Sequence, residues 1–143
     1  MSRKDHLAGG DAITTFDIRM KLPNREASMF PSAMHTIEHL GATYLRNHAD
    51  WADKVIYWGP MGCCTGFYLI LKGDLESLDI VPLMRELFQW MWQFEGEIPG
   101  ANPHDCGNYR FNHLGLAKWE ARTFYWCLVD IKDENMVYPK NDR

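Results

Sequence analysis

Within residues 12–20, the apolar residues Phe16, Ile18 and Met20 alternate with charged ones, which is the pattern of a half-buried β-strand. Residues 54–58 and 65–72 are rich in β-branched and aromatic side chains, which are also typical of strands. The glycine-rich stretch 59–62 separates these two segments. We therefore expect two strands joined by a tight turn, with the earlier strand beside them.

Apolar positions at helical spacing predict helices at about 31–48, 77–94 and 114–129. Pro31 lies near the first turn of the first helix, where its missing N–H costs little. Helices and strands are interspersed, and the connections between strands are short enough for antiparallel pairing. We therefore predict an α+β fold in which an antiparallel sheet packs against helices as a two-layer sandwich. The 143 residues fit one domain, 1–143.

Composition excludes some partners. The chain is 24% charged with a net charge of −4 and has no run of five Lys or Arg residues, so we expect no nucleic-acid partner. No stretch approaches the ~18 apolar residues of a membrane span, so we expect no membrane partner. The polar start of the chain lacks the apolar run of a signal peptide. The expected location is therefore cytoplasmic.

The four cysteines do not suggest a disulfide framework. Cys63 and Cys64 are adjacent, so a disulfide between them would be strained. Cys127 lies in an aromatic segment and is interpreted as a core residue, and Cys64 as a packing residue. Thiol chemistry or metal ligation is the better explanation for the other cysteines, Cys63 and Cys106.

The first predicted helix presents two faces. One is an apolar stripe, formed by Phe30, Ala33, Met34, Ile37, Gly41, Tyr44 and Leu45. On another face, His35 and His39 lie within roughly 40° of each other because residues four apart are nearly in line on a helix. Arg46 lies on the same side as the histidines, and Glu38 lies at the edge between the two faces.

The two histidines and the intervening glutamate form an HxxEH motif at 35–39. Two ring nitrogens one turn apart can converge on one metal ion, although histidines at this spacing are often plain surface residues. The same order occurs in one class of zinc peptidases. A catalytic metal also needs a third protein ligand and an open position. The candidates for the third ligand are Cys63, Cys64, Cys106, His48, His104 and His113.

The two remaining cysteines suggest different roles. Cys63 lies on a glycine-flanked turn, where it can be an accessible thiolate or a small buried turn residue. Cys106 lies beside a glycine in a loop of turn-forming residues and can reach a metal. One cysteine and two histidines suit zinc, iron(II) or cobalt. Spacing alone leaves His104 and His113 as alternatives to Cys106.

Taken together, these motifs resemble the S-ribosylhomocysteine lyase family, which makes the precursor of autoinducer-2 in bacteria. The matching stretches occur in the order and at the spacing of the family across about residues 5–130. They are FDIR at 16–19, PN at 23–24, HTIEHL at 35–40, PMGC at 60–63, TGFY at 65–68, IPGA at 98–101 and DCG at 105–107.

The resemblance implies a role for each matching residue. The implied metal ligands are His35, His39 and Cys106, the acid–base residues Cys63 and Glu38, and the substrate-contacting residues Arg19 and Arg46. It also implies a homodimer with active sites at the subunit interface and Fe(II) as the metal, with zinc or cobalt as possible substitutes.

The implied reaction moves the carbonyl of S-ribosylhomocysteine along its ribose chain and then eliminates homocysteine. The other product is 4,5-dihydroxy-2,3-pentanedione, the autoinducer-2 precursor. The resemblance therefore connects the chain to quorum sensing and to methionine metabolism.

Three departures from the family pattern keep alternatives open. Relatives carry an N-terminal arm before the segment that begins here at Ser2, and this chain lacks it. Cys64 stands where many relatives have a polar or basic residue, and Tyr57 where some have an acidic one. One alternative is a non-catalytic remnant that binds metal and substrate. The other is a zinc peptidase of the inverted HxxEH kind, which would need a downstream glutamate ligand and no cysteine.

Overall fold

The computed structural model of the chain describes residues 1–138 and contains one four-stranded antiparallel sheet. The strands are β1 (Ser2–His6), β2 (Ala12–Arg19), β3 (Val55–Pro60) and β4 (Gly66–Lys72). They lie in the order β1-β2-β4-β3, with β3 and β4 joined by the glycine-rich turn that the sequence predicts.

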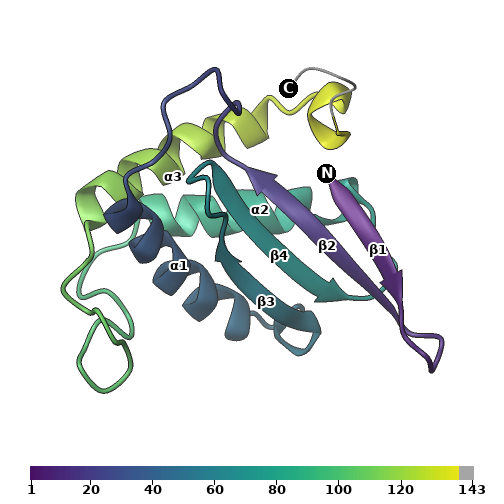
Figure 1. Cartoon of the computed structure of the whole chain (residues 1–143), viewed down its shortest axis with the longest axis horizontal. Helices are drawn as coiled ribbons and strands as arrows, with labels where there is room; N and C mark the ends of the chain where they lie inside the picture. The colour runs from purple at the N-terminus through teal and green to yellow at the C-terminus, as the bar shows by residue number, and fades with distance from the viewer. Residues whose placement is uncertain (139–143) are drawn as a thin grey trace.

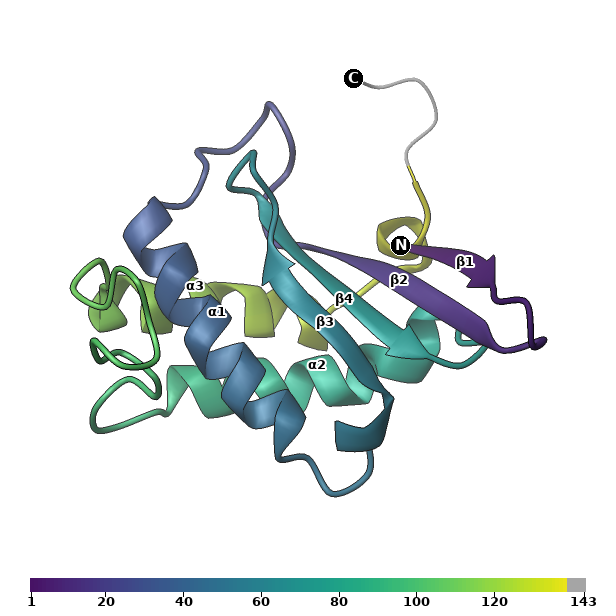
Figure 2. The same ribbon diagram turned by 60° about the horizontal axis from the view of Figure 1, so that its bottom comes forward.

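Three long helices cover one side of this sheet (Figures 1 and 2). They are α1 (Pro31–Arg46), α2 (Ser77–Trp92) and α3 (Leu114–Val129), and two short 3₁₀ turns span Ala52–Lys54 and Asp133–Met136. Helix α1 lies next to β3 in both views, while α2 and α3 run side by side behind the strands. The predicted α+β fold and its antiparallel sheet are confirmed.

The core forms where the alternating strand residues meet the helices. Phe16 and Ile18 of β2 stand opposite Leu69 and Phe67 of β4, and all four are buried. The Phe88 ring of α2 packs into the same cluster. Burial of such side chains stabilises the fold by about 1.5–3 kcal/mol each. The period of two in the sequence therefore marks the face of the sheet that binds the helices.

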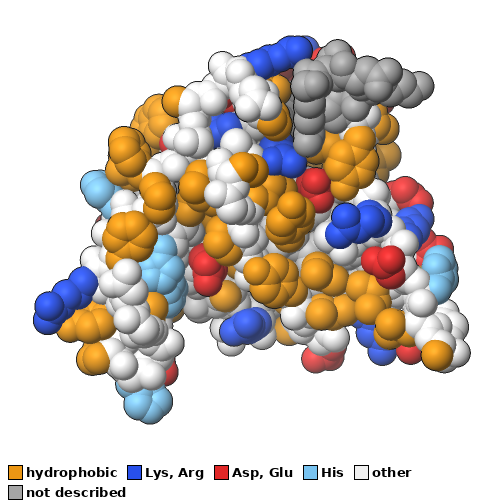
Figure 3. Space-filling view, in the orientation of Figure 1, with side chains coloured by type: hydrophobic (Ala, Val, Ile, Leu, Met, Phe, Trp, Pro, Cys, Tyr) orange, Lys and Arg blue, Asp and Glu red, His pale blue; other side chains and the backbone are white. Residues whose placement is uncertain are grey.

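The opposite face of the sheet is not covered by these helices. Side chains of Ile13, Tyr68 and Ile70 lie there half-buried, and Tyr57 is 46% exposed. Figure 3 shows hydrophobic side chains gathered over the strands on this side. We call this surface the open sheet face. Among residues 1–138, no helix combines the length and the apolar character needed to cross a membrane.

Some predictions from the sequence need correction. The sequence pattern did not predict strand β1. This strand has no buried residue, so it lacks the alternation of apolar and polar residues that marks β2. Its main-chain pairing with β2 holds it in the sheet. Phe30 is the N-cap of α1 and 67% exposed, so it does not belong to the apolar stripe. Cys127 is exposed on α3 rather than in the core. Helices α1 and α2 end slightly before the predicted 48 and 94.

Helix α1 approaches β3 closely at Gly41. The indole of Trp58 lies over this glycine and donates from Nε1 to the carbonyl of Ile37 at 3.4 Å. A Cβ atom at position 41 would overlap the indole ring. The missing side chain at Gly41 therefore lets the helix that carries the two histidines rest directly on the sheet.

We expect the substitution Gly41→Ala to lower the free energy of unfolding by about 1–2 kcal/mol. Overpacking against Trp58 costs about 1–3 kcal/mol, which outweighs the usual helical gain of about 0.5–1 kcal/mol for alanine. Urea denaturation measures the difference. The control is Gly115→Ala in α3, where the nearest atom to the new Cβ is 3.4 Å away. If the two variants have the same free energy of unfolding, the close approach of Gly41 to the Trp58 indole is contradicted.

Candidate active site

The two histidines of α1 point their rings at the same place. The His35 and His39 ring centroids are 4.6 Å apart, with an interplanar angle of 72°. Their Nε2 atoms are 3.0 Å apart. The sequence placed these residues on one face of a helix, and the structure brings their nitrogens into direct apposition.

A sulfur atom from a distant loop completes the cluster. Cys106 lies in the connection between α2 and α3, and its Sγ is 3.5 Å from Nε2 of His35. The three candidate ligand atoms lie within 4.8 Å of one another. We call His35, His39 and Cys106 the His–His–Cys cluster.

Backbone carbonyls determine which nitrogen of each ring carries hydrogen. Nδ1 of His35 lies 2.5 Å from the carbonyl oxygen of Phe111, and Nδ1 of His39 lies 2.9 Å from that of Pro99. Because a carbonyl can only accept, each Nδ1 must donate. In the neutral rings, both Nε2 atoms then face each other with lone pairs. Such an arrangement requires a positive charge between the rings.

A divalent metal fits this arrangement of donors. Bond lengths of about 2.0–2.3 Å to nitrogen and sulfur put two ligands of one tetrahedral ion roughly 3.3–3.6 Å apart. The 3.0 Å and 3.5 Å separations in the His–His–Cys cluster are close to that range. The backbone N–H of Asn108 donates to Sγ of Cys106 at 3.4 Å. The three residues can therefore hold a metal.

The rival histidines make other contacts. His104 is bonded to Asp105 at 2.8 Å, with a side chain that is 93% exposed. Nδ1 of His113 accepts from the backbone of Leu116 as the N-cap of α3. His48 lies 3.2 Å from Glu86. None of these side chains joins the cluster found among residues 1–138, so Cys106 is the third member.

An open cleft of about 400 Å³ lies beside the His–His–Cys cluster. Glu38, His39 and Arg46 line it from α1, and Asp105 lines it from the loop that carries Cys106. The sequence pattern singled out the three α1 residues, but Asp105 was quoted only as part of a motif. A small ligand in this cleft would meet a carboxylate and a guanidinium next to one of the histidines.

The second thiol forms a separate group at the turn between β3 and β4. Cys63 is exposed, and its Sγ lies 2.9 Å from Oγ1 of Thr65 and 3.6 Å from Nη1 of Arg19. Arg19 also donates to Oγ1 of Thr65 at 2.6 Å, which leaves the hydroxyl proton of Thr65 free to point at the sulfur. Hydrogen bonding from Thr65 and the nearby Arg19 charge lower the pKa of the Cys63 thiol.

The predicted site residues thus fall into two groups. His35, His39 and Cys106 lie together, with Glu38 and Arg46 on the adjoining cleft. Within the described part of the chain, no hydrogen bond or ion pair links Cys63 and Arg19 to those residues, although Arg19 and Cys63 contact each other.

The sequence did not predict the groups that contact the histidine rings and the Cys63 sulfur. The carbonyls of Phe111 and Pro99 belong to backbone and carry no side-chain signature. Thr65 appeared only as part of a motif, and its contact with Cys63 depends on the shape of the turn. The one signal in the sequence for this contact was the position of the Thr65 hydroxyl, two residues after the candidate thiolate Cys63.

Comparisons with known proteins give matches over nearly the whole chain. A family model described as S-ribosylhomocysteinase (LuxS) matches residues 1–135. The S-ribosylhomocysteine lyase of Phocaeicola vulgatus is 57% identical over 143 residues, covering 99% of this chain and 88% of that protein. Similar lyases from Clostridium beijerinckii and Porphyromonas gingivalis are 56% and 51% identical, each covering 97% of this chain and 87% of its own length.

We expect Thr65→Val to raise the pKa of the Cys63 thiol, because the substitution removes the hydroxyl that stabilises the thiolate. The alkylation rate of Cys63 by iodoacetamide, followed by peptide mass spectrometry, should then rise at higher pH than in the unaltered protein. Thr65→Ser keeps the hydroxyl and serves as the control. If both variants give the original pH profile, the hydroxyl does not activate this thiol.

Proposed function

Because the chain belongs to the S-ribosylhomocysteinase (LuxS) family, we propose that it is an S-ribosylhomocysteine lyase, a metal-dependent carbon–sulfur lyase. It converts S-ribosylhomocysteine into homocysteine and 4,5-dihydroxy-2,3-pentanedione, the precursor of autoinducer-2. The observation that carries this proposal is the apposition of two imidazole lone pairs and a loop sulfur beside an open cleft. The cysteine in this set favours the lyase over an inverted zinc peptidase.

The proposed metal ligands are His35, His39 and Cys106, and the proposed metal is Fe(II), with zinc or cobalt as substitutes. Mixed nitrogen and sulfur donors suit all three ions. When bound, the metal supplies a Lewis acid for the carbonyl and hydroxyl oxygens of the sugar chain, an effect worth several kcal/mol. The cleft next to His39 would give the sugar chain access to the metal site.

Cys63 is the proposed base for the carbonyl shifts. Each shift removes a proton from the carbon next to the carbonyl and returns it to the neighbouring carbon. A thiolate with a lowered pKa, supported by Thr65 and Arg19, can take the proton and give it back near neutral pH. Arg19, whose guanidinium lies beside this sulfur, is also a proposed contact for the substrate.

Glu38 is the proposed base for the final elimination. The half-buried carboxylate lines the cleft beside His39, where it can reach a carbon acid of the bound sugar chain. Removal of the proton α to the ketone breaks the C–S bond at the β carbon, and the sulfur leaves with the electron pair as homocysteine thiolate. Arg46, which lines the same cleft, is the proposed contact for an anionic or hydroxyl group of the substrate.

A homodimer is part of the proposal. The open sheet face carries hydrophobic side chains such as Tyr68 and Ile70, and a second copy of the chain could cover them. Arg19 lies at the end of β2 on the same side, so an interface there would pass close to the Cys63 group. The proposed location is the cytoplasm, where the thiols of Cys63 and Cys106 stay reduced.

We expect the anaerobically purified protein, loaded with Fe(II) or Co(II), to release free thiol from S-ribosylhomocysteine. Cys63→Ser should lower the turnover rate about 10²–10⁴-fold, because it removes the acid–base group, while the bound metal remains. A thiol-release assay and metal analysis on the same samples give both values. Release that stays at background with full metal occupancy would reject the lyase and favour a non-catalytic remnant.

We also expect Co(II) to report the ligand set directly. The loaded protein should show thiolate-to-cobalt charge-transfer absorption, which Cys106→Ser should abolish and Cys63→Ser should keep. His39→Ala should lower cobalt occupancy, because it removes one of the converging nitrogens. Retention of the charge-transfer band in Cys106→Ser would remove this cysteine from the proposed ligands.

A further inference from the structure

Thr36 is a polar residue in the core side of α1 that the proposed reaction does not use. It lies directly after His35 and has 0% exposed surface. Burying a hydroxyl costs free energy unless it is hydrogen-bonded, so its partners indicate what it does. One partner is the carbonyl oxygen of Ser32, 3.2 Å away and one turn earlier on α1. The other partners lie on a distant segment of the chain, residues 109–113, which we call the Phe111 segment.

The Thr36 hydroxyl ties the Phe111 segment to α1. Oγ1 donates to Oδ1 of Asn112 at 2.8 Å and accepts from the backbone N–H of His113 at 3.0 Å. Nδ2 of Asn112 in turn donates to the carbonyl of Tyr109 at 2.9 Å. The hydroxyl therefore binds the end of the segment at Asn112 and His113, and the Asn112 amide binds its beginning at Tyr109.

Phe111 lies between these anchors and faces His35. Its carbonyl accepts from Nδ1 of His35, and its ring is 6.2 Å from the imidazole at an interplanar angle of 28°. Thr36 and His35 are neighbours on α1, so they bind neighbouring points of the same segment. The position of the Phe111 carbonyl relative to the His35 ring therefore depends on the Thr36 contacts.

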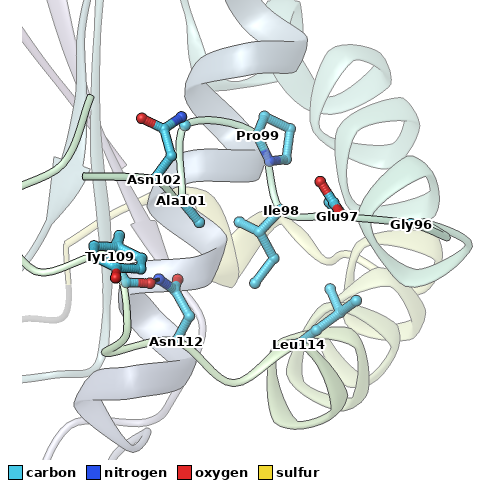
Figure 4. Close-up of a pocket in the computed structure, with 10 residues that line it drawn as sticks. Gly96, Glu97, Ile98, Pro99, Ala101, Asn102, Tyr109, Asn112 and Leu114 are labelled. Carbon is cyan, nitrogen blue, oxygen red and sulfur yellow. Dashed lines mark hydrogen bonds between the residues drawn. The ribbon is translucent and has the colours of Figure 1, made fainter. Parts of the chain in front are cut away.

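Packing from the other side does not fully enclose the Phe111 segment. A cavity of about 650 Å³ separates it from residues 96–102, and Tyr109 and Asn112 lie on one side of this cavity with Ile98 and Pro99 on the other (Figure 4). Within residues 1–138, the hydrogen bonds from the Phe111 segment to α1 end on Thr36 or His35. These bonds must fix what the packing does not.

We propose that Thr36 is a positioning residue for the metal site. Its hydroxyl holds the Phe111 carbonyl in place, so that His35 keeps its hydrogen on Nδ1 and directs Nε2 at His39 and Cys106. The inference rests on the proposed metal-binding function, because the benefit of a fixed His35 is a ready ligand. Outer contacts of this kind are typically worth a factor of 10–100 in metal affinity.

The first test compares Thr36→Val, which removes only the hydroxyl, with Thr36→Ser, which restores it. Competition with a chelator measures Co(II) affinity. We expect Thr36→Val to bind Co(II) about 10–100-fold more weakly and Thr36→Ser to bind as the unaltered protein does. Asn112→Ala removes the tether from the loop side and should weaken binding in the same direction, which keeps the test valid if Thr36→Val folds poorly.

The second test uses the metal-free protein. Long-range ¹H–¹⁵N spectra report which ring nitrogen carries hydrogen, and a His35→Gln spectrum assigns the signals. We expect the Nδ1–H form of His35 in the unaltered protein and a mixture of both forms in Thr36→Val and Asn112→Ala. Thr123→Val, which removes an exposed helical hydroxyl on α3, should change neither the spectrum nor the affinity.

The outcomes separate this inference from the proposed function. If Thr36→Val and Asn112→Ala lower only thermal stability and keep both the Co(II) affinity and the His35 spectrum, Thr36 is structural and the inference is overturned. If the unaltered protein fails to bind Co(II), the proposed function fails. The metal-free spectrum still tests whether Thr36 controls the form of His35.

Discussion

Two ring nitrogens from helix α1 face each other 3.0 Å apart, and the other nitrogen of each ring lies against a backbone carbonyl. Lone pairs at that separation repel unless a cation lies between them. The carbonyls of Phe111 and Pro99 therefore do more than orient His35 and His39, because they prevent either ring from turning its hydrogen toward the other. This arrangement supports the proposal that His35 and His39 hold a metal together with Cys106.

The scaffold supplies this arrangement from three directions. Gly41 lets α1 rest on Trp58 of the sheet, which fixes the helix that carries both histidines. The long connection between α2 and α3 returns past the same helix and brings Cys106 to the rings. The glycine-rich turn between β3 and β4 exposes Cys63 with its activating neighbours.

The two thiols illustrate how environment assigns chemistry. Cys106 receives a backbone N–H from Asn108 and lies against His35, which suits a metal ligand. Cys63 is exposed and lies against Thr65 and Arg19, which lower its pKa and suit proton transfer. Both are free cysteines in the same chain, so the separate roles proposed for them rest on the groups around each sulfur rather than on the residue type.

Local sequence patterns were sufficient to predict the features that depend on neighbouring residues. The alternation at residues 12–20 and the helical spacing at 31–48 are properties of neighbouring residues, so they indicated strand β2, helix α1 and the convergence of His35 and His39. Strand β1 escaped because an exposed edge strand is stabilised by main-chain pairing and needs no apolar pattern. The role of Cys106 came from resemblance, since spacing left rivals open.

Contacts between groups that are far apart in the sequence could be identified only from the three-dimensional fold. Cys106 and His35 are 71 residues apart along the chain. Thr36 is separated from Asn112 and His113 by 76 and 77 residues along the sequence. Such contacts depend on the path of the loops and on backbone carbonyls. Every residue has the same backbone carbonyl, so a pattern of residue types cannot reveal which carbonyl will make a contact. The convergence of the two histidines was therefore predictable from the sequence pattern, whereas the third member of the cluster and the contacts that hold the rings in position were not.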